Sequence, residues 1–421
     1  MAFSASPISA SCPTPEGPQQ VGEVIRSFIF KSEKASEMEL LVTATANTSW
    51  QTAEAEAAVL SVFLDGRYSQ DIILFAGDSR FDYKALLGRV EAGEHKVELA
   101  LNRERSAAKA ANVSIRSARV RSLSTADPID RFAVENSPVI FVRPDAVDKF
   151  SDIPLLTYYE VLPLSPDSGK IRYTTIFTNE DGGTQTAALM ARWGRATDIE
   201  WVTEITYEHG RITAETFQAA NHETKIFGGQ RVIGSHPQIL TATVNNNFAD
   251  HGCSALKIAN VPFRADLSHR SRENVMDEFP WVHRIMAQEA IREGRVDPAN
   301  MGPNVIDDPR NYLYVDVYAE LSNASVSVQL KADGGKISSS DASDPRLRIG
   351  RSGFQRTAVR LPSRSSQLAS ITITCNRDSG DQTSVCRNHK IIGVLGLSGK
   401  YEPVLLKPGK GLSKAIMIDS K

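Results

Sequence analysis

Short runs of hydrophobic residues, broken by turn-forming residues, make up most of the chain. Between residues 23 and 125 these runs alternate with turn signals such as Asp65-Gly66 and Ala92-Gly93, and no helical pattern separates them. The predicted strands are Val24–Phe30, Glu39–Ala46, Ala57–Leu64, Lys96–Leu101 and Val113–Val120. Regularly spaced short strands without helices are typical of a β-sandwich. We therefore predict an N-terminal β-sandwich over residues 23–125.

A larger β-rich central domain is predicted over residues 135–310, after a polar linker at Ser124–Asp130. Its predicted strands are Val139–Val142, Leu155–Leu162, Ile171–Thr178, Thr186–Trp193, Asp198–Tyr207 and Ile239–Val244. Strand patterns return from Tyr312 onward, so residues 311–421 form a third β-rich domain or complete the central one. Residues 1–22, rich in Pro, Ser and Gln, are predicted to be a disordered tail.

One segment of the central domain has the spacing of a helix instead. Its apolar stripe consists of Val282, Ile285, Met286 and Ala290. Pro280 fits the first turn of this helix, and Gly294 fits its end. The predicted fold is therefore mostly β, an N-terminal β-sandwich followed by a larger β-rich domain with one principal helix.

Composition argues against two classes of protein, nucleic-acid binders and membrane-spanning proteins. The 421 residues include 48 Lys and Arg against 50 Asp and Glu, a formal net charge of −2. A surface that binds nucleic acid needs an excess of basic side chains on at least one face, so no nucleic-acid partner is expected. No stretch approaches the length of about 18 apolar residues that a membrane helix needs, so no membrane span is expected either.

Two cysteines give a hint about the compartment. Cys375 and Cys386 flank a polar segment between the strand-like runs Ile371–Thr374 and Ile391–Leu397. A hairpin would place them opposite each other with Cα atoms closer than about 7 Å, near enough for a disulfide. Two unpaired thiols are the alternative. A disulfide would favour an extracellular or periplasmic protein, because thiols stay reduced in the cytosol.

Candidate chemistry gathers between Asp198 and His283, where six of the eight histidines lie. In the predicted strand that starts at Asp198, side chains alternate between two faces. The residues expected on one face are Asp198, Glu200, Glu204 and Glu208. Those expected on the other, in the core, are Ile199, Trp201, Ile205 and Tyr207. Carboxylates suit calcium, and carboxylates with imidazole suit zinc. We predict a divalent cation, calcium or zinc, bound by Asp198, Glu200, His222 and His251.

Residues 193–251 also resemble two known β-sandwich families. The segment Gly194-Arg195-x-x-Asp198-x-Glu200-Trp201 is similar to the Gly-His-Arg-His-Asp-Trp-Glu motif of the necrosis-inducing, cytolysin-like proteins, and to the Gly-Asp-Trp-Glu-His segment of a vacuolar-sorting-like family. The resemblance implies that the acidic pair lies at a cation site or ligand cleft, with His222 or the run His236-Pro237-Gln238-Ile239 close by. The chain departs from the first motif at Ala196, Thr197 and Ile199.

Each candidate also has a purely structural interpretation. Asp198 and Glu200 can form the solvated face of an antiparallel strand, which is the commoner role of alternating acidic residues. His222 and His251 can be exposed loop residues rather than ligands. We expect His209 at an exposed hairpin tip, His283 on the solvent side of the helix, and Asn245-Asn246-Asn247 at a strand end rather than at a sugar.

These residues leave more than one function open. The first is an exported carbohydrate-active protein, a metal-dependent glycoside hydrolase or polysaccharide lyase with Asp198, Glu200 and His222 as catalytic residues. The alternative is a non-catalytic carbohydrate-binding or surface-interaction protein, in which the same cluster holds a structural cation. A structural assembly protein is a third. The stretch 63–97 resembles the accessory sandwich modules of secreted carbohydrate-active proteins, which also implies a carbohydrate ligand.

Overall fold

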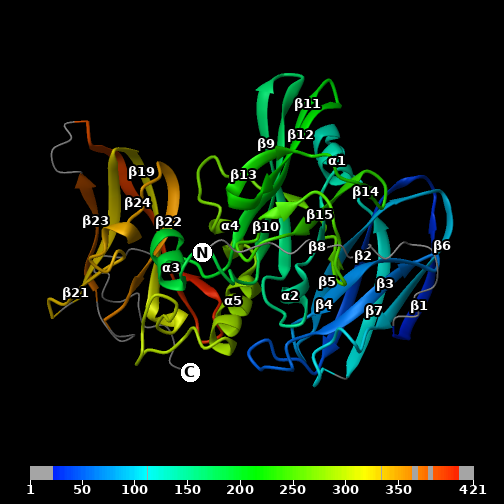
Figure 1. The fold of residues 1–421 in the computed structure, drawn as a ribbon, viewed down its shortest axis with the longest axis horizontal. Coiled ribbons are helices and arrows are strands. Elements are labelled where there is room, and N and C mark those ends of the chain that lie inside the picture. Colours follow the sequence, from blue (N-terminus) through cyan, green and yellow to red (C-terminus); the bar gives the residue numbers. More distant parts are fainter. Residues whose placement is uncertain (1–21, 111, 333, 363–367, 378–382, 407–421) are drawn as a thin grey trace. The chain divides into compact units, whose positions relative to one another are not determined.

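A computed structural model describes residues 22–110, 112–332, 334–362, 368–377 and 383–406 (Figure 1). The predicted tail, residues 1–22, lies outside the described residues except for Gly22. Strands make up 51% of the structure and helices 12%, which confirms the predicted mostly-β fold. The chain divides into two compact units. Unit 1 contains the chain up to Asp181 and Ile199–Ala265, and unit 2 contains Gly182–Asp198 and the chain from Asp266 onward.

The first half of unit 1 is the predicted N-terminal β-sandwich (Figure 1, blue to cyan). One sheet has the strand order β1 (Glu23–Ser32), β6 (Gly93–Leu101), β3 (Ala58–Leu64), β4 (Arg67–Leu74), and the other has the order β5 (Phe81–Val90), β2 (Ser36–Ala46), β7 (Val113–Ser122). All neighbouring strands are antiparallel. Alternate side chains of these strands fill the core, among them the fully buried Leu40, Val42, Leu60, Leu86 and Leu99.

The second half of unit 1 is a long mixed sheet. Its strand order is β17 (Lys257–Ile258), β8 (Val139–Phe141), β15 (His236–Thr241), β16 (Phe248–Ala249), β12 (Arg211–Ala219), β11 (Ile199–Glu208), β10 (Ser168–Phe177), β9 (Pro154–Ser165), β18 (Phe263–Arg264). Two short strands, β13 (Glu223–Ile226) and β14 (Arg231–Val232), pair with β12 and β15. The strands from β9 to β12 form an antiparallel meander. One core on this sheet contains Phe177, Val202, Phe217, Ile239 and Phe248.

The predicted linker at Ser124–Asp130 is wrong in its second half, where helix α1 (Pro128–Glu135) begins. The Asp127 carboxylate accepts hydrogen bonds from the amides of Ile129 and Asp130, and Pro128 occupies the first turn. An acidic N-cap followed by proline stabilises a helix start because it satisfies amides that have no partner within the helix. A shorter helix, α2 (Pro144–Val147), follows β8.

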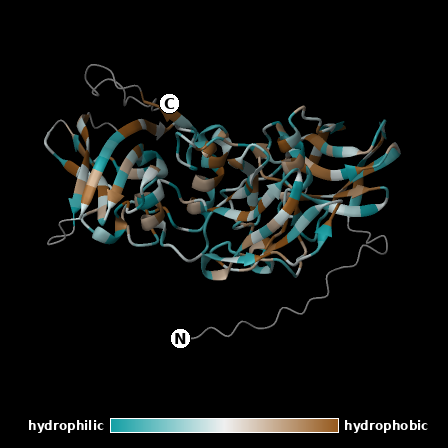
Figure 2. Ribbon diagram, turned by 90° about the horizontal axis from the view of Figure 1, so that it is seen from above, coloured by the Kyte–Doolittle hydropathy of each residue, from teal (hydrophilic) through white to brown (hydrophobic). Residues whose placement is uncertain are grey.

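Unit 2 is a second β-sandwich with helices α3 (Thr186–Trp193), α4 (Asn274–Asp277) and α5 (Pro280–Arg292). Its two sheets have the orders β22 (Gly353–Arg360), β19 (Tyr312–Ser322), β24 (Val385–Leu397), β25 (Pro403–Leu405) and β21 (Ile337–Ser339), β20 (Ala324–Ala332), β23 (Leu368–Arg377). Figure 2 shows hydrophobic and hydrophilic residues in alternation along these strands. The buried side chains include Val315, Val317, Val326, Val328 and Leu330.

Helix α5 confirms the predicted principal helix, with Pro280 in its first turn and Gly294 at a φ of 70° just after its end. The predicted strand Thr186–Trp193 is wrong, because this segment is helix α3. Gly194 ends α3 at a φ of 61° and donates its amide to the Met190 carbonyl, 2.9 Å away. A continuous apolar run fits a strand or a buried helix equally well, and a left-handed glycine after the run favours the helix.

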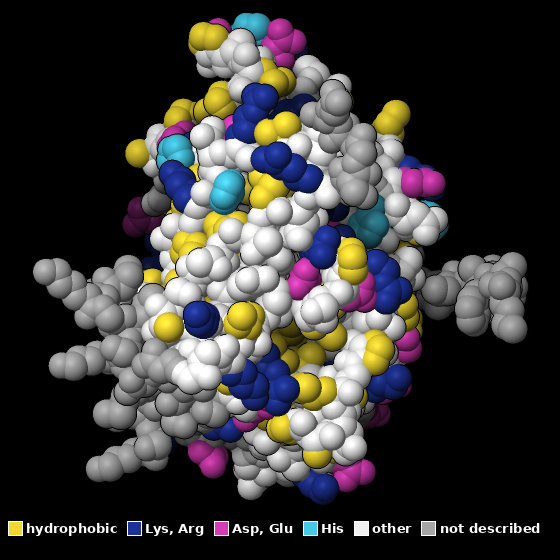
Figure 3. Space-filling view, turned by 90° about the vertical axis from the view of Figure 1, so that its left-hand side faces the viewer, with side chains coloured by type: hydrophobic (Ala, Val, Ile, Leu, Met, Phe, Trp, Pro, Cys, Tyr) yellow, Lys and Arg dark blue, Asp and Glu magenta, His cyan; other side chains and the backbone are white. Residues whose placement is uncertain are grey.

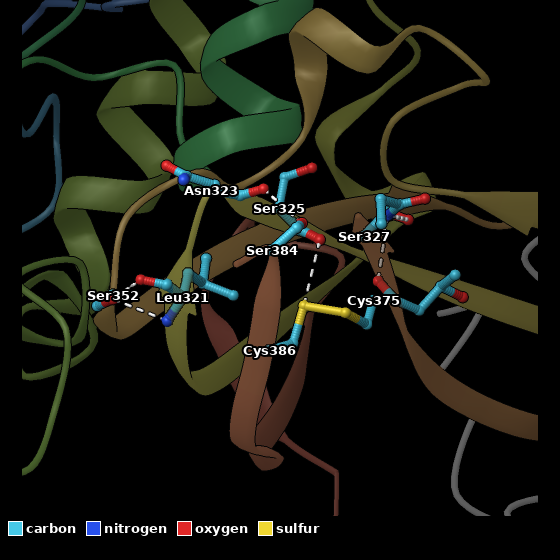
Figure 4. The surroundings of a disulfide bond; sticks show 10 residues. Leu321, Asn323, Ser325, Ser327, Ser352, Cys375, Ser384 and Cys386 are labelled. Carbon is cyan, nitrogen blue, oxygen red and sulfur yellow. Dashed lines mark hydrogen bonds between the residues drawn. A yellow bond between two sulfur atoms is a disulfide. The ribbon is translucent and has the colours of Figure 1, made fainter. Parts of the chain in front are cut away.

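A disulfide joins Cys375 and Cys386, whose Cα atoms lie 6.0 Å apart (Figure 4). The predicted pairing is therefore confirmed, but the predicted hairpin is wrong. Cys375 lies on β23, which pairs with β20, whereas Cys386 lies on β24, which pairs with β19. The bond therefore links the two sheets of the unit 2 sandwich.

None of the described helices is long and apolar enough to cross a membrane. On the face shown in Figure 3, the described basic side chains lie among acidic and hydrophobic ones. This mixture agrees with the near balance of 48 basic and 50 acidic residues in the chain.

Candidate functional site

Glu200 lies in a polar cluster of unit 1. It is the second residue of β11, and its side chain is only 11% exposed. Its Oε2 accepts a hydrogen bond from Gln218 Nε2 at 2.7 Å and lies 3.8 Å from His222 Nδ1. Gln218 is 2% exposed and lies near the end of β12. The carboxylate is thus held by the neighbouring strand, with the imidazole beside it.

His222 reaches this cluster from a turn with unusual backbone angles. Asn221 and His222 follow β12 in a short 3-10 turn and have φ values of 60° and 59°. Residues other than glycine seldom adopt this left-handed backbone conformation, because their Cβ atom crowds the following carbonyl oxygen. The imidazole is 52% exposed, and its Nδ1 lies 2.6 Å from Gln218 Nε2. Backbone strain of this kind often accompanies ligand sites.

Two asparagines complete the cluster. Asn245 Nδ2 lies 3.0 Å from His222 Nε2, and Asn247 Nδ2 lies 3.3 Å from His222 Nδ1. Both residues belong to the turn that connects β15 to β16. Asn247 is fixed there because its backbone N–H donates a hydrogen bond to Thr243 Oγ1 at 3.0 Å. The imidazole therefore has an amide neighbour at each ring nitrogen, which sets the orientation of the ring.

The predicted division of the strand into an acidic face and a core face is wrong in part: Ile199, Ile205 and Tyr207 are buried as predicted, but Trp201 is only partly buried. Arg172 lies over the Trp201 ring, 5.7 Å from its centre, and also binds Glu204, so Trp201 and Glu204 lie on the same side of β11. The pairing of β10 with β11 is irregular between Trp201 and Thr203, where Val202 is an extra residue. A bulge of this kind shifts the alternation by one position.

Asp198 belongs to unit 2, where it is 1% exposed. Its Oδ1 lies 3.7 Å from Nη1 of Arg195, which is also buried and lies 3.3 Å from Glu273 Oε1. The interpretation of Asp198 and Glu200 as a solvated strand face is wrong, because both residues are buried. Within unit 2, Asp198 takes part in an ion pair with arginine.

His251 is exposed, with 87% of its side chain accessible, and its Nδ1 lies 2.9 Å from Asp250 Oδ1. Burial raises the pKa of Asp250, but hydrogen bonds from His251 and from the Gly228 amide outweigh this effect and lower it overall. Among the described residues, no three of Asp198, Glu200, His222 and His251 bring ligand atoms within 4.8 Å of one another. Glu200 and His222 are the pair of predicted ligands that the structure brings together.

The other histidines separate into exposed and buried positions. His209 is 72% exposed between β11 and β12, so the predicted hairpin tip is confirmed. His283 is fully buried in unit 2, and its Nε2 lies 2.9 Å from Asp277 Oδ1. The predicted solvent position of His283 is wrong, because helix α5 is buried on more than one side.

Sequence reasoning missed Gln218 and assigned Asn245-Asn246-Asn247 to a strand end. The three asparagines lie in the turn after β15, and two of them contact His222. Gln218 lies four residues before His222, but no local pattern distinguishes it from other polar residues of a strand. Its role depends on the pairing of β12 with β11.

No family model matches the chain, and no curated protein matches it. Among solved structures, the C-terminal domain of the sugar-binding protein EclA is similar at 13% identity over 28% of this chain and 89% of that domain, with a TM-score of 0.15. A similarity of this size bears neither on the fold nor on the ligand of the chain.

Proposed function

We propose that unit 1 binds carbohydrate at the polar cluster of Glu200, Gln218, His222, Asn245 and Asn247. The observation that supports this function is the convergence of a carboxylate, three amides and an imidazole on one strained turn. Such groups donate and accept hydrogen bonds, as sugar hydroxyls do.

Within the cluster, the exposed groups and the buried groups have different roles. His222 and Asn245 are partly exposed, so a ligand reaches them first. Glu200, Gln218 and Asn247 are buried and fix the imidazole. Gln218 Oε1 is buried without a hydrogen-bond partner among the described residues, which leaves an acceptor for a water molecule or a ligand hydroxyl.

A second candidate, turnover of the bound sugar by a hydrolase or lyase, is favoured by one shared contact. His222 Nδ1 lies 3.8 Å from Glu200 Oε2, beyond a direct hydrogen bond, but Gln218 Nε2 contacts both atoms. This amide links the carboxylate to an imidazole, a side chain that serves as a general acid or base. Binding is the better supported function, because Glu200 is the one carboxylate whose described contacts belong to this cluster.

Two further features belong to the same proposal. The protein is exported, for which the disulfide between Cys375 and Cys386 is the support. A bound divalent cation would use Glu200 Oε2 and His222 as its protein ligands in unit 1. Glu200→Gln should then lower the calcium or zinc content that metal analysis finds in the purified protein.

The function is tested by binding of the full chain to a panel of neutral polysaccharides and oligosaccharides. His222→Ala and Glu200→Gln should each weaken binding at least tenfold, because the first removes the exposed contact and the second removes the charge that holds it. Release of reducing ends from the same panel distinguishes hydrolysis from binding, and a lyase would release unsaturated products from a uronate polysaccharide instead.

His209→Ala is the matched control. His209 also follows a strand end, has a left-handed φ of 49° and lies next to a glutamate, but it is outside the cluster. Equal binding by the His209→Ala and His222→Ala variants, or no binding to any member of the panel, would contradict the proposed function.

A further inference from the structure

A polar pocket lies in the N-terminal sandwich of unit 1. It has a volume of about 470 Å³ and is lined by Thr45, Asp78, Arg80, Arg116 and Ser117. Thr45 comes from β2, Arg116 and Ser117 come from β7, and Asp78 and Arg80 come from the loop between β4 and β5. This volume lies within the range of small-molecule sites.

The two arginines of this pocket have no polar partner within the described part of the chain. Arg80 and Arg116 are exposed and form no hydrogen bond or ion pair with any other described residue. With Asp78 they leave an excess of one positive charge. A guanidinium presents paired N–H donors that match the two oxygens of a carboxylate, so two of them on one pocket favour a planar anionic group.

The backbone around the pocket is held in place. The Ala46 amide donates to the Gly77 carbonyl at 3.0 Å, and the Gly77 amide donates to Thr48 Oγ1 at 3.2 Å. Gly77 has a φ of 70°, and a Cβ there would lie 2.9 Å from the Thr48 carbonyl oxygen. The loop that carries Asp78 and Arg80 is therefore fastened to the end of β2.

The hydroxyl side of the pocket is also fixed. Ser117 Oγ donates to Thr43 Oγ1 at 3.0 Å, and Thr43 Oγ1 donates to Asp82 Oδ1 at 2.6 Å. Ser117 therefore offers an oriented hydroxyl oxygen beside the arginines, Thr45 adds a second hydroxyl to the lining, and the Asp78 carboxylate offers an acceptor for a ligand hydroxyl. The same carboxylate repels a dianion such as phosphate, because like charges in one pocket oppose each other.

From these features we infer that the sandwich pocket binds an acidic sugar unit through its carboxylate. Arg80 and Arg116 take the carboxylate, and Asp78, Thr45 and Ser117 take the ring hydroxyls. This site is separate from the cluster around His222, has a different ligand charge, and depends on none of its residues.

Calorimetric titration of the full chain with glucuronic acid and with oligogalacturonate tests the inference. Arg80→Ala and Arg116→Ala should each weaken binding at least tenfold, and the affinity should fall as salt is added. Arg119→Ala is the control, because it removes the same charge from β7 at an exposed residue outside the pocket. Melting curves of the three variants verify that they are folded.

The other ligands of the titration distinguish the alternatives. Tighter binding of inorganic phosphate or of a sulfated glycan than of the uronate would overturn the assignment to a carboxylated sugar. So would equal losses in the Arg80, Arg116 and Arg119 variants, or no uronate binding at millimolar concentration. His222→Ala should leave uronate binding unchanged, so failure of this site and failure of the proposed function give different results.

Discussion

Nε2 of His236 lies 3.1 Å from Oε2 of Glu37, and both side chains are buried. Glu37 belongs to β2 of the sandwich and His236 to β15 of the long sheet, so this pair connects the two halves of unit 1. The other ring nitrogen, Nδ1, lies 2.9 Å from the Ser137 carbonyl oxygen. Every polar atom of the imidazole thus has a partner, as burial requires.

Removal of His236 should therefore destabilise unit 1. His236→Ala leaves the Glu37 carboxylate buried without this partner, and loss of one member of a buried pair costs about 3–5 kcal/mol. Urea unfolding measures the change. His251→Ala, at an exposed position, should change stability by less than about 0.5 kcal/mol. Similar losses in the two variants would show that the buried pair does not stabilise the unit.

Local pattern was sufficient for five of the seven sandwich strands and for helix α5, because burial of one face is decided within about ten residues. Strands β4 and β5 were not predicted. It was insufficient for Trp201. The extra residue at Val202 belongs to the pairing of β11 with β10, and a bulge has no signature in one strand alone. The prediction of a shared acidic face depended on an unbroken alternation and was lost with it.

The candidate site was predicted in part for the same reason. Glu200 and His222 were identified from residue type, and the structure places them 3.8 Å apart. Gln218 lies between them only because β12 runs beside β11. The pairing of Cys375 with Cys386 was predicted from a hairpin that the structure lacks, because the assignment of β23 and β24 to different sheets depends on contacts with β19 and β20.

Loss of the disulfide should destabilise unit 2. Cys375 and Cys386 are 11 residues apart, and closure of a loop of this length restricts the unfolded chain by about 3 kcal/mol. The Cys375→Ser, Cys386→Ser double variant should unfold at lower urea concentration than the wild-type protein. Reductant should shift the wild-type protein in the same direction. A variant as stable as the oxidised wild type would contradict the prediction.

Gly194 should tolerate alanine poorly. Its φ is 61°, and a Cβ there would lie 2.5 Å from Cγ of Arg356. Arg356 cannot move easily, because it is fully buried and binds Asp277 and Asp316 through both sides of its guanidinium. Burial raises the pKa of Asp277, but the hydrogen bonds and charge of Arg356 outweigh this effect and lower it overall.

Gly210→Ala gives the matched comparison for Gly194→Ala. Gly210 also has a left-handed φ, 73°, but a Cβ there would meet no atom within 4 Å. Both variants carry the backbone penalty of about 1–2 kcal/mol for a left-handed residue. Gly194→Ala should lose a further 1–3 kcal/mol or so from overpacking, which thermal or urea unfolding can measure. Equal losses at the two positions would exclude a close contact with Arg356.

The buried Lys257 should make the folding stability of the protein depend on pH. Its residue is 8% exposed, and its Nζ lies 4.8 Å from the centre of the Tyr68 ring and 5.9 Å from that of Phe141. Burial lowers the pKa of Lys257 from 10.5 to about 8, against the opposing charge of Asp71. Between pH 8 and 10.5 the unfolded chain therefore holds a proton that the folded chain has released.

Stability consequently rises with pH across that window, because the unfolded state binds more protons there. The shift corresponds to at most roughly 3 kcal/mol. Lys257→Met removes this penalty, so the variant should be more stable than the wild type at pH 7, and the difference should shrink as the pH approaches 10. Urea unfolding of both proteins at several pH values measures this difference.

Lys84→Met, at an exposed position of β5, controls for the change of side chain and should alter stability by less than about 0.5 kcal/mol. A difference between Lys257→Met and the wild type that stays constant from pH 7 to 10 would show that Lys257 keeps its proton in the folded protein.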